Sequence, residues 1–242
     1  SGFWLGCLQL YSSGTKQVNL ALSNRGFGEC SGMISPDNTK FIVNIPKNAS
    51  SYVLDWTTRF NWKTAVVTND TWPDLKEIVV ILRDPLSRWV SGMSQYLKTY
   101  VLCPVGPNGP VFPGMIEGAE DYSMTADDFT SLYNQTTERL IFDNVFRFDD
   151  HVWPQHDFHE HIRPNLPRRY FMLDKNFDAN FASSLELSTV TNLDRNDGND
   201  NPDTKKLHEF LRYRLNIRPE LGERVQKAYA RDYEIIKQVF NQ

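Results

Sequence analysis

The amino-acid sequence predicts a three-layer α/β fold in which a central parallel sheet is flanked by helices. Short runs of β-branched and aliphatic residues alternate with segments whose apolar residues recur at helical spacing. This alternation is typical of parallel strands joined by right-handed crossovers. The chain has 242 residues, of which 40% are hydrophobic. It is therefore long enough to bury a complete core, and its length favours one domain, residues 1–242, over two.

The N-terminal region, residues 1–40, is rich in Gly, Ser and Asn and has weak periodicity, so we expect an irregular cap or an edge hairpin there. Residues 41–100 carry the clearest pattern. They predict a strand, a helix, and two further strands, at residues 41–45, 51–60, 63–67 and 77–82.

The next predicted element is a long helix, with Asp84 as its N-cap and Pro85 at its first position. Residues 103–125 are rich in proline and glycine and indicate an excursion without a regular element. The remaining predictions are a helix capped by Thr125, a strand at residues 169–174, a polar loop at 192–202, and a helical C-terminus over 204–240 with a break at 218–219.

Composition excludes several classes of protein. The formal net charge of −4 and the lack of a long basic run argue against nucleic acid as a partner. No apolar run approaches the roughly 18 to 20 residues of a membrane span, and the first residues lack the basic region of a signal peptide. Cys7, Cys30 and Cys103 are too few and too scattered for a disulfide framework or a zinc knuckle. We therefore expect a soluble, cytoplasmic protein with reduced thiols.

The first candidate binding loop is the sequence PKNASS, residues 46–51, between a buried strand and the start of a helix. Such a turn directs backbone N–H groups and the positive end of the helix dipole towards one point, which attracts phosphate or sulfate. Lys47 adds a cation, and Ser50 and Ser51 add hydroxyl groups. An ordinary turn with a serine cap is the alternative. An ATP-binding P-loop fits less well, because its glycines are missing and Lys47 precedes the hydroxyl residues by three positions.

The second loop begins ILRDPLSRWVS at Ile81 and resembles the second cofactor motif of PAPS-dependent sulfotransferases. In that motif an arginine after a strand and a serine eight residues later hold a phosphate, and Arg83 and Ser91 have this spacing. PKNASS is similar to the family's first motif, Pro-Lys-x-x-[ST]-[ST]. The resemblance is closest to the carbohydrate O-sulfotransferases, whose second motif often reads RDPxxRxVS. It covers residues 41–100, with a weaker likeness in AYARDYEII near the C-terminus.

This resemblance implies a P-loop-like sulfotransferase fold and an enzyme that transfers the sulfuryl group of PAPS to an acceptor hydroxyl, with a carbohydrate as the favoured acceptor. It implies that Lys47 stabilises the bridging oxygen, and that Arg83 and Ser91 bind the 3′-phosphate. No metal is expected. The phosphosulfate would lie against the N–H groups or hydroxyls of Asn48, Ala49, Ser50, Ser51 and Tyr52. Asn48 and Ala49 replace the commoner glycine-containing pair, so we expect the turn to close without positive-φ freedom at those positions.

The family's catalytic base lies near the end of the strand after the first helix, or in the loop beyond it. Asp70 is the nearest candidate in this sequence, although it is equally a turn or cap residue. His151 is the rival base, by analogy with a histidine and Pro-Gln element of some carbohydrate sulfotransferases. We place Asp70 first, because a residue that leaves the second strand emerges beside the first phosphate loop.

Three alternatives remain open from the sequence. The same fold could serve a non-catalytic nucleotide-binding or interaction module. A P-loop kinase would use Asp84 to bind magnesium, although Asp84 is better explained as a helix cap. A zinc site could form from His156, His159 and His161. Aromatic rings that could stack on an acceptor are Trp72 and Trp153.

Overall fold

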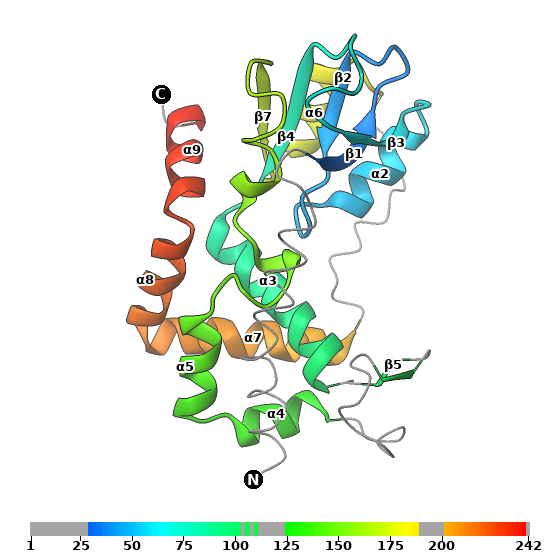
Figure 1. Ribbon diagram of the computed structural model, residues 1–242. Coiled ribbons are helices and arrows are strands. Elements are labelled where there is room, and N and C mark those ends of the chain that lie inside the picture. The colour runs from blue at the N-terminus through cyan, green and yellow to red at the C-terminus, as the bar shows by residue number, and fades with distance from the viewer. Residues whose placement is uncertain (1–28, 103–104, 107–108, 111–123, 189–200, 241–242) are drawn as a thin grey trace. The chain divides into compact units, whose positions relative to one another are not determined.

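The computed structural model describes residues 29–102, 105–106, 109–110, 124–188 and 201–240 (Figure 1). Contacts along the chain divide these residues into two compact units. We call residues 29–88, 153–188 and 229–240 the sheet unit, and the remaining described residues the helical unit. Cys7, Cys103, most of the expected excursion and most of the polar loop lie outside the described residues.

The sheet unit contains a five-stranded sheet with the order β3-β1-β2-β4-β7. The strands are β1 (Cys30–Ile34), β2 (Lys40–Val43), β3 (Lys63–Val67), β4 (Glu77–Leu82) and β7 (Arg168–Met172). β2, β4 and β7 pair in parallel, whereas β1 is antiparallel to both β2 and β3. The prediction of a wholly parallel sheet was therefore wrong, and the sheet is mixed.

The antiparallel strand follows from the short connection between β1 and β2. Only residues 35–39 separate the two strands, and a parallel crossover needs a dozen or more. Asp37 closes this turn by accepting hydrogen bonds from Ser35 Oγ at 2.6 Å and Thr39 Oγ1 at 2.8 Å. Asn38 adopts a left-handed conformation, with φ of 59°. The hairpin alternative was correct in kind, but its first strand lies inside the sheet and not at an edge.

Residues 30–34 gave a weak strand signal because of Gly32, which the packing of the hairpin requires. A Cβ atom at this position would lie 2.0 Å from the carbonyl oxygen of Ile42 and 2.7 Å from the ring of Phe41. Glycine in a strand often marks such a close approach of backbone to backbone. Gly32 thus permits the close packing of the hairpin, and it also weakens the strand pattern of residues 30–34 in the sequence.

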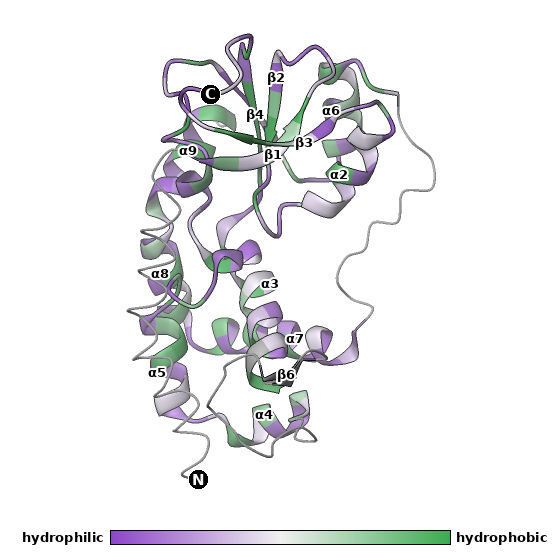
Figure 2. Cartoon of the chain, turned by 45° about the vertical axis from the view of Figure 1, so that its right-hand side comes forward, coloured by the Kyte–Doolittle hydropathy of each residue, from purple (hydrophilic) through white to green (hydrophobic). Residues whose placement is uncertain are grey.

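Helices cover both faces of the sheet. On one face, α2 (Ser50–Thr58) and α6 (Phe177–Leu185) bury Trp56 and Phe181 against Ile42, Val79 and Ile81. On the other face, α9 (Ala230–Phe240) packs with residues 158–166 against Phe41, Val43, Ile78 and Val80. Hydrophobic residues run along β4, which is buried on both faces (Figure 2).

The helical unit begins within α3 (Pro85–Leu97), which continues into a π-helical turn, η1 (Lys98–Leu102). It also contains α4 (Ala126–Leu132), α5 (Gln135–Asp143), η2 (Asp150–Val152), α7 (Pro202–Ile217), α8 (Pro219–Ala228), and the short strands β5 (Val105–Gly106) and β6 (Gly109–Pro110). Glu138 is buried in this unit and pairs with Arg214 and Arg218. The pairing offsets the cost of burying a carboxylate.

The predicted helix starts after Asp84 and Thr125 are confirmed, whereas some other predicted boundaries differ by one or two residues, as in α2 (Ser50–Thr58, predicted 51–60). Asp84 Oδ2 accepts a hydrogen bond of 2.7 Å from Ser87 N, and Thr125 forms a capping box with Asp128. The C-terminal helices break at Arg218, as expected, and again at Tyr229. The described residues hold eight α-helices with the mixed five-stranded sheet, which confirms the α/β class. None of the helices found in these residues is both long enough and apolar enough to span a membrane.

Candidate functional site

The turn between β2 and α2 leaves the start of a helix without a side-chain cap. Ala49 is the N-cap residue, and no side chain accepts a hydrogen bond there. The first hydrogen bond of the helix runs from Val53 N to Ala49 O, at 2.9 Å. The N–H groups of Ser50 and Ser51 precede this bond and have no partner within the helix. The alternative of a serine-capped turn was therefore wrong, and the positive end of the helix dipole remains available to an anion.

The backbone of this turn is left-handed at two residues that are not glycine. Lys47 has φ of 68° and Ala49 has φ of 58°. The expectation that Asn48 and Ala49 close the turn without positive φ was wrong at Ala49. Lys47, for which no such expectation was made, is also left-handed, and each of the two costs about 1 kcal/mol or more. A left-handed residue beside a right-handed one can turn successive N–H groups towards one side and so favour an anion. The N–H group of Asn48 itself donates to Ile45 O at 3.1 Å.

Two buried side chains hold the turn in this conformation. Asn48, which is only 2% exposed, donates from Nδ2 to Ile81 O at 2.7 Å and to Gln155 Oε1 at 2.6 Å. Arg88 is also buried and donates from Nε to Pro46 O at 3.0 Å and from Nη1 to Trp153 O. The side chains of Asn48 and Arg88 therefore support the turn, which leaves the backbone, Lys47 and the serines as its candidate anion-binding groups.

The structure brings the second loop against the first. Arg83, which follows β4, donates from Nη1 to Lys47 O at 3.0 Å. β2 and β4 are parallel neighbours, so both loops leave the sheet at the carboxyl ends of their strands. Two cationic residues predicted from separate motifs thus lie at one edge of the sheet, where ligands of α/β proteins commonly bind.

Gln155, in the 3-10 turn η3 (Gln155–Phe158), joins these two loops and was not predicted. Its side chain is fully buried. Oε1 accepts from Asn48 Nδ2 and, at 2.9 Å, from Arg83 N, while Nε2 donates to Arg83 O at 2.9 Å. The sequence analysis used the Pro-Gln element only as an analogy for His151. A buried amide that joins two loops has no periodicity or charge pattern that a single sequence would reveal.

Asp232 on α9 fixes the backbone that carries Gln155. Its carboxylate is buried and accepts from Gln155 N at 2.8 Å and from His156 N at 2.9 Å, and it also pairs with His156 Nδ1 at 2.8 Å. These carboxylate contacts outweigh burial and raise the pKa of His156. Asp232 belongs to AYARDYEII, the segment with the weaker family likeness, and the structure gives this residue a supporting role.

The predicted base Asp70 lies in an exposed turn after β3. Its N–H donates to Thr68 Oγ1 at 3.2 Å, and its carboxylate forms no hydrogen bond or ion pair with the described residues. Arg163 holds the turn by donating from Nη1 to Asn69 O at 2.6 Å and to Thr71 O at 3.2 Å. The Asp70 carboxylate is thus exposed to solvent, and hydrogen bonds from Arg163 hold the turn that carries it. Ser91 is half-buried on α3, within the helical unit.

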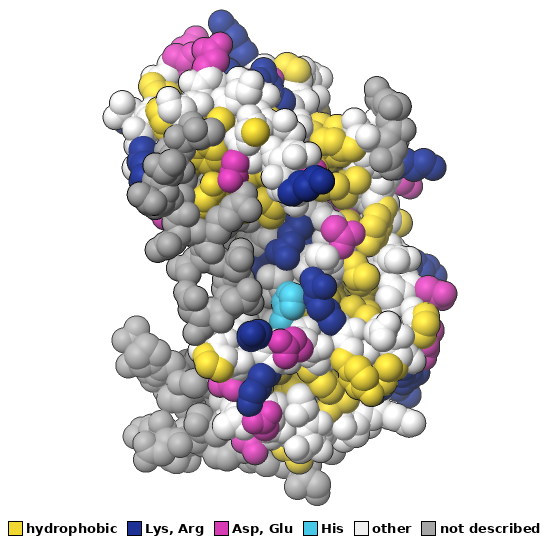
Figure 3. Space-filling view, turned by 180° about the vertical axis from the view of Figure 1, so that it is seen from behind, with side chains coloured by type: hydrophobic (Ala, Val, Ile, Leu, Met, Phe, Trp, Pro, Cys, Tyr) yellow, Lys and Arg dark blue, Asp and Glu magenta, His cyan; other side chains and the backbone are white. Residues whose placement is uncertain are grey.

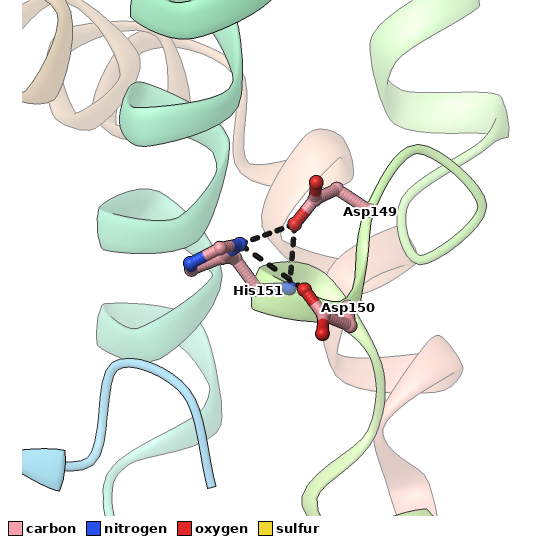
Figure 4. A group of neighbouring side chains, drawn as sticks. All are labelled: Asp149, Asp150 and His151. Atoms are coloured by element: carbon pink, nitrogen blue, oxygen red, sulfur yellow. Dashed lines mark hydrogen bonds and ion pairs between the residues drawn. The ribbon is translucent and has the colours of Figure 1, made fainter.

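His151, the rival base, belongs to the helical unit and pairs with two carboxylates (Figure 4). Its Nδ1 contacts Asp149 Oδ1, and lies 3.2 Å from Asp150 Oδ1. The hydrogen bond with Asp149 has the largest effect on the imidazole, and that with Asp150 comes second. Together they raise the pKa of His151 to about 9. The imidazole therefore carries a proton at neutral pH and is a poor base there.

Among the described residues, this trio is the one group whose potential metal-ligand atoms all lie within 4.8 Å of one another. An imidazolium between two carboxylates accounts for the arrangement without an ion. The three histidines of the zinc alternative do not converge. His156 binds Asp232, His159 is buried with neither ring nitrogen hydrogen-bonded, and His161 is exposed.

The two tryptophans considered for the acceptor site both pack within the sheet unit. Trp72 donates from Nε1 to Val66 O at 3.0 Å and lies against the core. Trp153 packs on Phe158, with ring centroids 6.2 Å apart, and its buried Nε1 has no hydrogen-bond partner among the described residues. Their rings therefore serve first as parts of the core.

A cavity of about 420 Å³ opens beside the β2–α2 turn, on the face of the sheet covered by α2. Its walls come from β1, β2, β3, α2 and one residue of β4. The lining residues are Ser31, Gly32, Met33, Ile42, Val43, Asn44, Ile45, Asn48, Ser50, Ser51, Val53, Leu54, Thr64, Ala65, Val66 and Ile81. Neither Asp70 nor His151 is among them, and the turn contributes Asn48, Ser50 and Ser51.

On the face of the molecule in Figure 3, basic and acidic side chains are interspersed among the described residues, without an extended basic surface. This agrees with the net charge of −4. Comparison of the chain with protein-family models, with curated proteins and with solved structures found no match in any of the three.

Proposed function

We propose that the protein is a PAPS-dependent sulfotransferase that acts on an acceptor hydroxyl. The single observation that carries this proposal is the contact of two loops, each after a parallel strand, through Arg83 and the carbonyl group of Lys47. The sequence alone related these loops to the two cofactor motifs of one family. Their meeting at one edge of the sheet is what a ligand with two separate phosphate groups requires.

The residues present fit such a ligand. The left-handed Lys47 and Ala49 and the uncapped start of α2 form an anion site with the hydroxyls of Ser50 and Ser51. Arg83 is a second cation whose planar group suits a phosphate. PAPS, when bound, supplies an activated sulfuryl group and a 3′-phosphate. The first site suits its phosphosulfate, and Arg83 suits its 3′-phosphate.

The protein's own contribution would be placement and charge. Lys47 stabilises negative charge that develops at the mouth of the turn, and the fixed backbone N–H groups do so without reorganisation. A base must also accept the proton of the acceptor hydroxyl. Asp70 remains the proposed base, since His151 is protonated at neutral pH. The family resemblance favours a carbohydrate acceptor.

Calorimetry with adenosine 3′,5′-bisphosphate tests the donor site. We expect saturable binding that is tighter than that of ATP with magnesium, and at least tenfold weaker binding by Arg83→Gln, because a charged hydrogen-bonding partner of the phosphate is lost. Arg139→Gln is the matched control, since Arg139 is exposed on α5 and pairs only with the neighbouring Asp143 among the described residues. Equal bisphosphate affinity in wild type and Arg83→Gln would refute the role of Arg83.

The two rival functions give different results with the same protein. A non-catalytic module would bind the bisphosphate, yet no acceptor would become labelled from radioactive PAPS. A P-loop kinase would bind ATP with magnesium and ignore the bisphosphate. Tight binding of ATP alone would therefore replace the sulfotransferase proposal.

A further inference from the structure

We propose that the cavity beside the β2–α2 turn binds the acceptor, and that this acceptor is an uncharged hydroxyl compound with an apolar body. This inference rests on the proposed function and narrows its substrate class. It departs from the expectation of a carbohydrate, because the chemistry of the cavity wall does not suit a polyhydroxylated or anionic sugar.

The wall of the cavity carries no charged and no aromatic side chain among the described residues that line it. Its apolar residues include Met33, Ile42 and Val53, which pack on the α2 face of the sheet, and Val66 is 53% exposed although it is β-branched and apolar. An anionic group would lose its hydration here without a compensating cation. Small-molecule sites of this volume are mostly apolar with a few placed polar groups, which is what this wall provides.

The wall also has polar residues on β1, after β2 and on β3, which are Ser31, Asn44 and Thr64, and three more lie where the cavity meets the turn. Asn48, Ser50 and Ser51 come from the turn and the start of α2. Asn48 donates both of its described side-chain hydrogen bonds to carbonyl oxygens, which fixes the orientation of its amide. Its Oδ1 atom is buried and has no hydrogen-bond partner among the residues that the structure describes. A hydroxyl group offers the donor that this oxygen lacks, whereas a purely apolar ligand does not.

The order of the strands assigns the cavity to the acceptor and not to the nucleoside. β2 lies between β1 and β4. Arg83 follows β4, so a nucleoside whose 3′-phosphate binds Arg83 lies on the β4 side of the turn. The cavity extends over β1 and β3, on the other side. Transfer of a sulfuryl group in line, as in phosphoryl transfer, brings the acceptor from the side opposite the leaving group.

The reaction that follows is balanced. The acceptor oxygen forms a bond to sulfur, the bond from that sulfur to the phosphate oxygen breaks, and adenosine 3′,5′-bisphosphate is the leaving group. The hydroxyl proton passes through water to Asp70, the proposed base, which does not itself line the cavity. Asp70 follows β3, whose residues 64–66 line the cavity.

Methyl-labelled protein tests the location and the chemistry without a turnover measurement. Phenol, glucose and glucuronate are titrated separately while the methyl resonances are recorded by NMR, with and without the bisphosphate. We expect phenol to shift the methyl signals of Met33, Val53 and Leu54 saturably and to leave those of Ile141 and Val225, in the helical unit, unmoved. Glucose should bind more weakly, and glucuronate should cause no shift.

Variants of Val66 provide the second arm. Val66→Asp places a carboxylate in the wall at an exposed position, and Val66→Phe fills the cavity while it keeps strand propensity. Each should weaken phenol binding at least tenfold and leave bisphosphate affinity within twofold of wild type. Leu132→Asp is the matched control, because Leu132 is 49% exposed on α4 in the helical unit.

The inference fails if phenol leaves the cavity methyl groups unmoved, if glucuronate or glucose shifts them as much as phenol does, or if both Val66 variants bind phenol as the wild type does. Its failure is distinguishable from failure of the proposed function. In the first case the bisphosphate still binds and depends on Arg83, whereas in the second case the bisphosphate itself does not bind.

Discussion

At the scale of single residues, the phosphate-loop candidate depends on buried side chains that hold its backbone in place. Lys47 and Ala49 adopt left-handed backbone conformations that residues with a Cβ atom seldom take. Asn48 and Arg88 offset this cost by binding backbone carbonyl groups on both sides of the turn. A strained turn that is held by buried hydrogen bonds is preorganised. The free energy of anion binding is therefore not reduced by the cost of ordering the turn.

Gln155 is the residue on which this support depends most. We predict that Gln155→Leu lowers the free energy of unfolding by about 2 to 4 kcal/mol, because Asn48 Nδ2 and the backbone of Arg83 lose partners in a buried setting. Urea denaturation measures this change. Gln135→Leu, at the exposed start of α5, is the control and should differ little from wild type. Stability of Gln155→Leu equal to that of the control would show that the amide is not a structural link.

At the scale of elements, two helical glycines have opposite environments. On α3, a Cβ atom at Gly92 would lie 2.3 Å from the carbonyl oxygen of His151, whereas on α8 the nearest atom to a Cβ at Gly222 is Leu215 Cδ2, at 3.9 Å. Only glycine thus lets the segment around His151 approach α3. This contact places the imidazole and its two carboxylates beside the helix (Figure 4).

The two positions give a matched pair of substitutions. We predict that Gly222→Ala raises the free energy of unfolding by about 0.5 to 1 kcal/mol, through helix propensity. Gly92→Ala should lower it by about 1 to 3 kcal/mol, because the new methyl group overpacks against a backbone atom. Thermal or urea denaturation of both variants measures the difference. A stabilising Gly92→Ala would mean that α3 and residue 151 are not packed as described.

At the scale of the whole molecule, His159 makes stability depend on pH. The imidazole is fully buried in the sheet unit, and its ring packs against Tyr170 with centroids 5.8 Å apart. Burial, with the nearby charge of Arg168 as a second cause, lowers the pKa of His159 to about 4, from the 6.5 that is ordinary for a histidine. The unfolded chain therefore takes up a proton at higher pH than the folded protein does.

The sign of the effect follows from this difference. The contribution of His159 to stability is fully present above pH 6.5 and is lost as the pH falls towards 4, by up to about 3 kcal/mol. We predict that His159→Phe removes this part of the pH dependence when unfolding free energies are measured between pH 7 and pH 4. Parallel profiles for wild type and His159→Phe would contradict the assignment.

The sequence by itself determined the elements whose signals are local. Short stretches of sequence were enough to predict the buried β-branched strands, the caps at Asp84 and Thr125, and the break at Arg218. Burial pattern and capping depend on residues that are close in sequence. The α/β class and the two candidate loops follow from the same stretches. Their interpretation as cofactor motifs came from a resemblance, and it remains a proposal.

Only the tertiary structure decided which distant groups meet. The insertion of β1 between β3 and β2, the bond of Arg83 to Lys47 O, and the link of Gln155 to both loops all join segments that are remote in sequence or weakly patterned. The charge state of His151 and the uncharged wall of the cavity depend likewise on neighbours brought together by folding. Backbone hydrogen bonds and packing at long range set these features, and no local propensity encodes them.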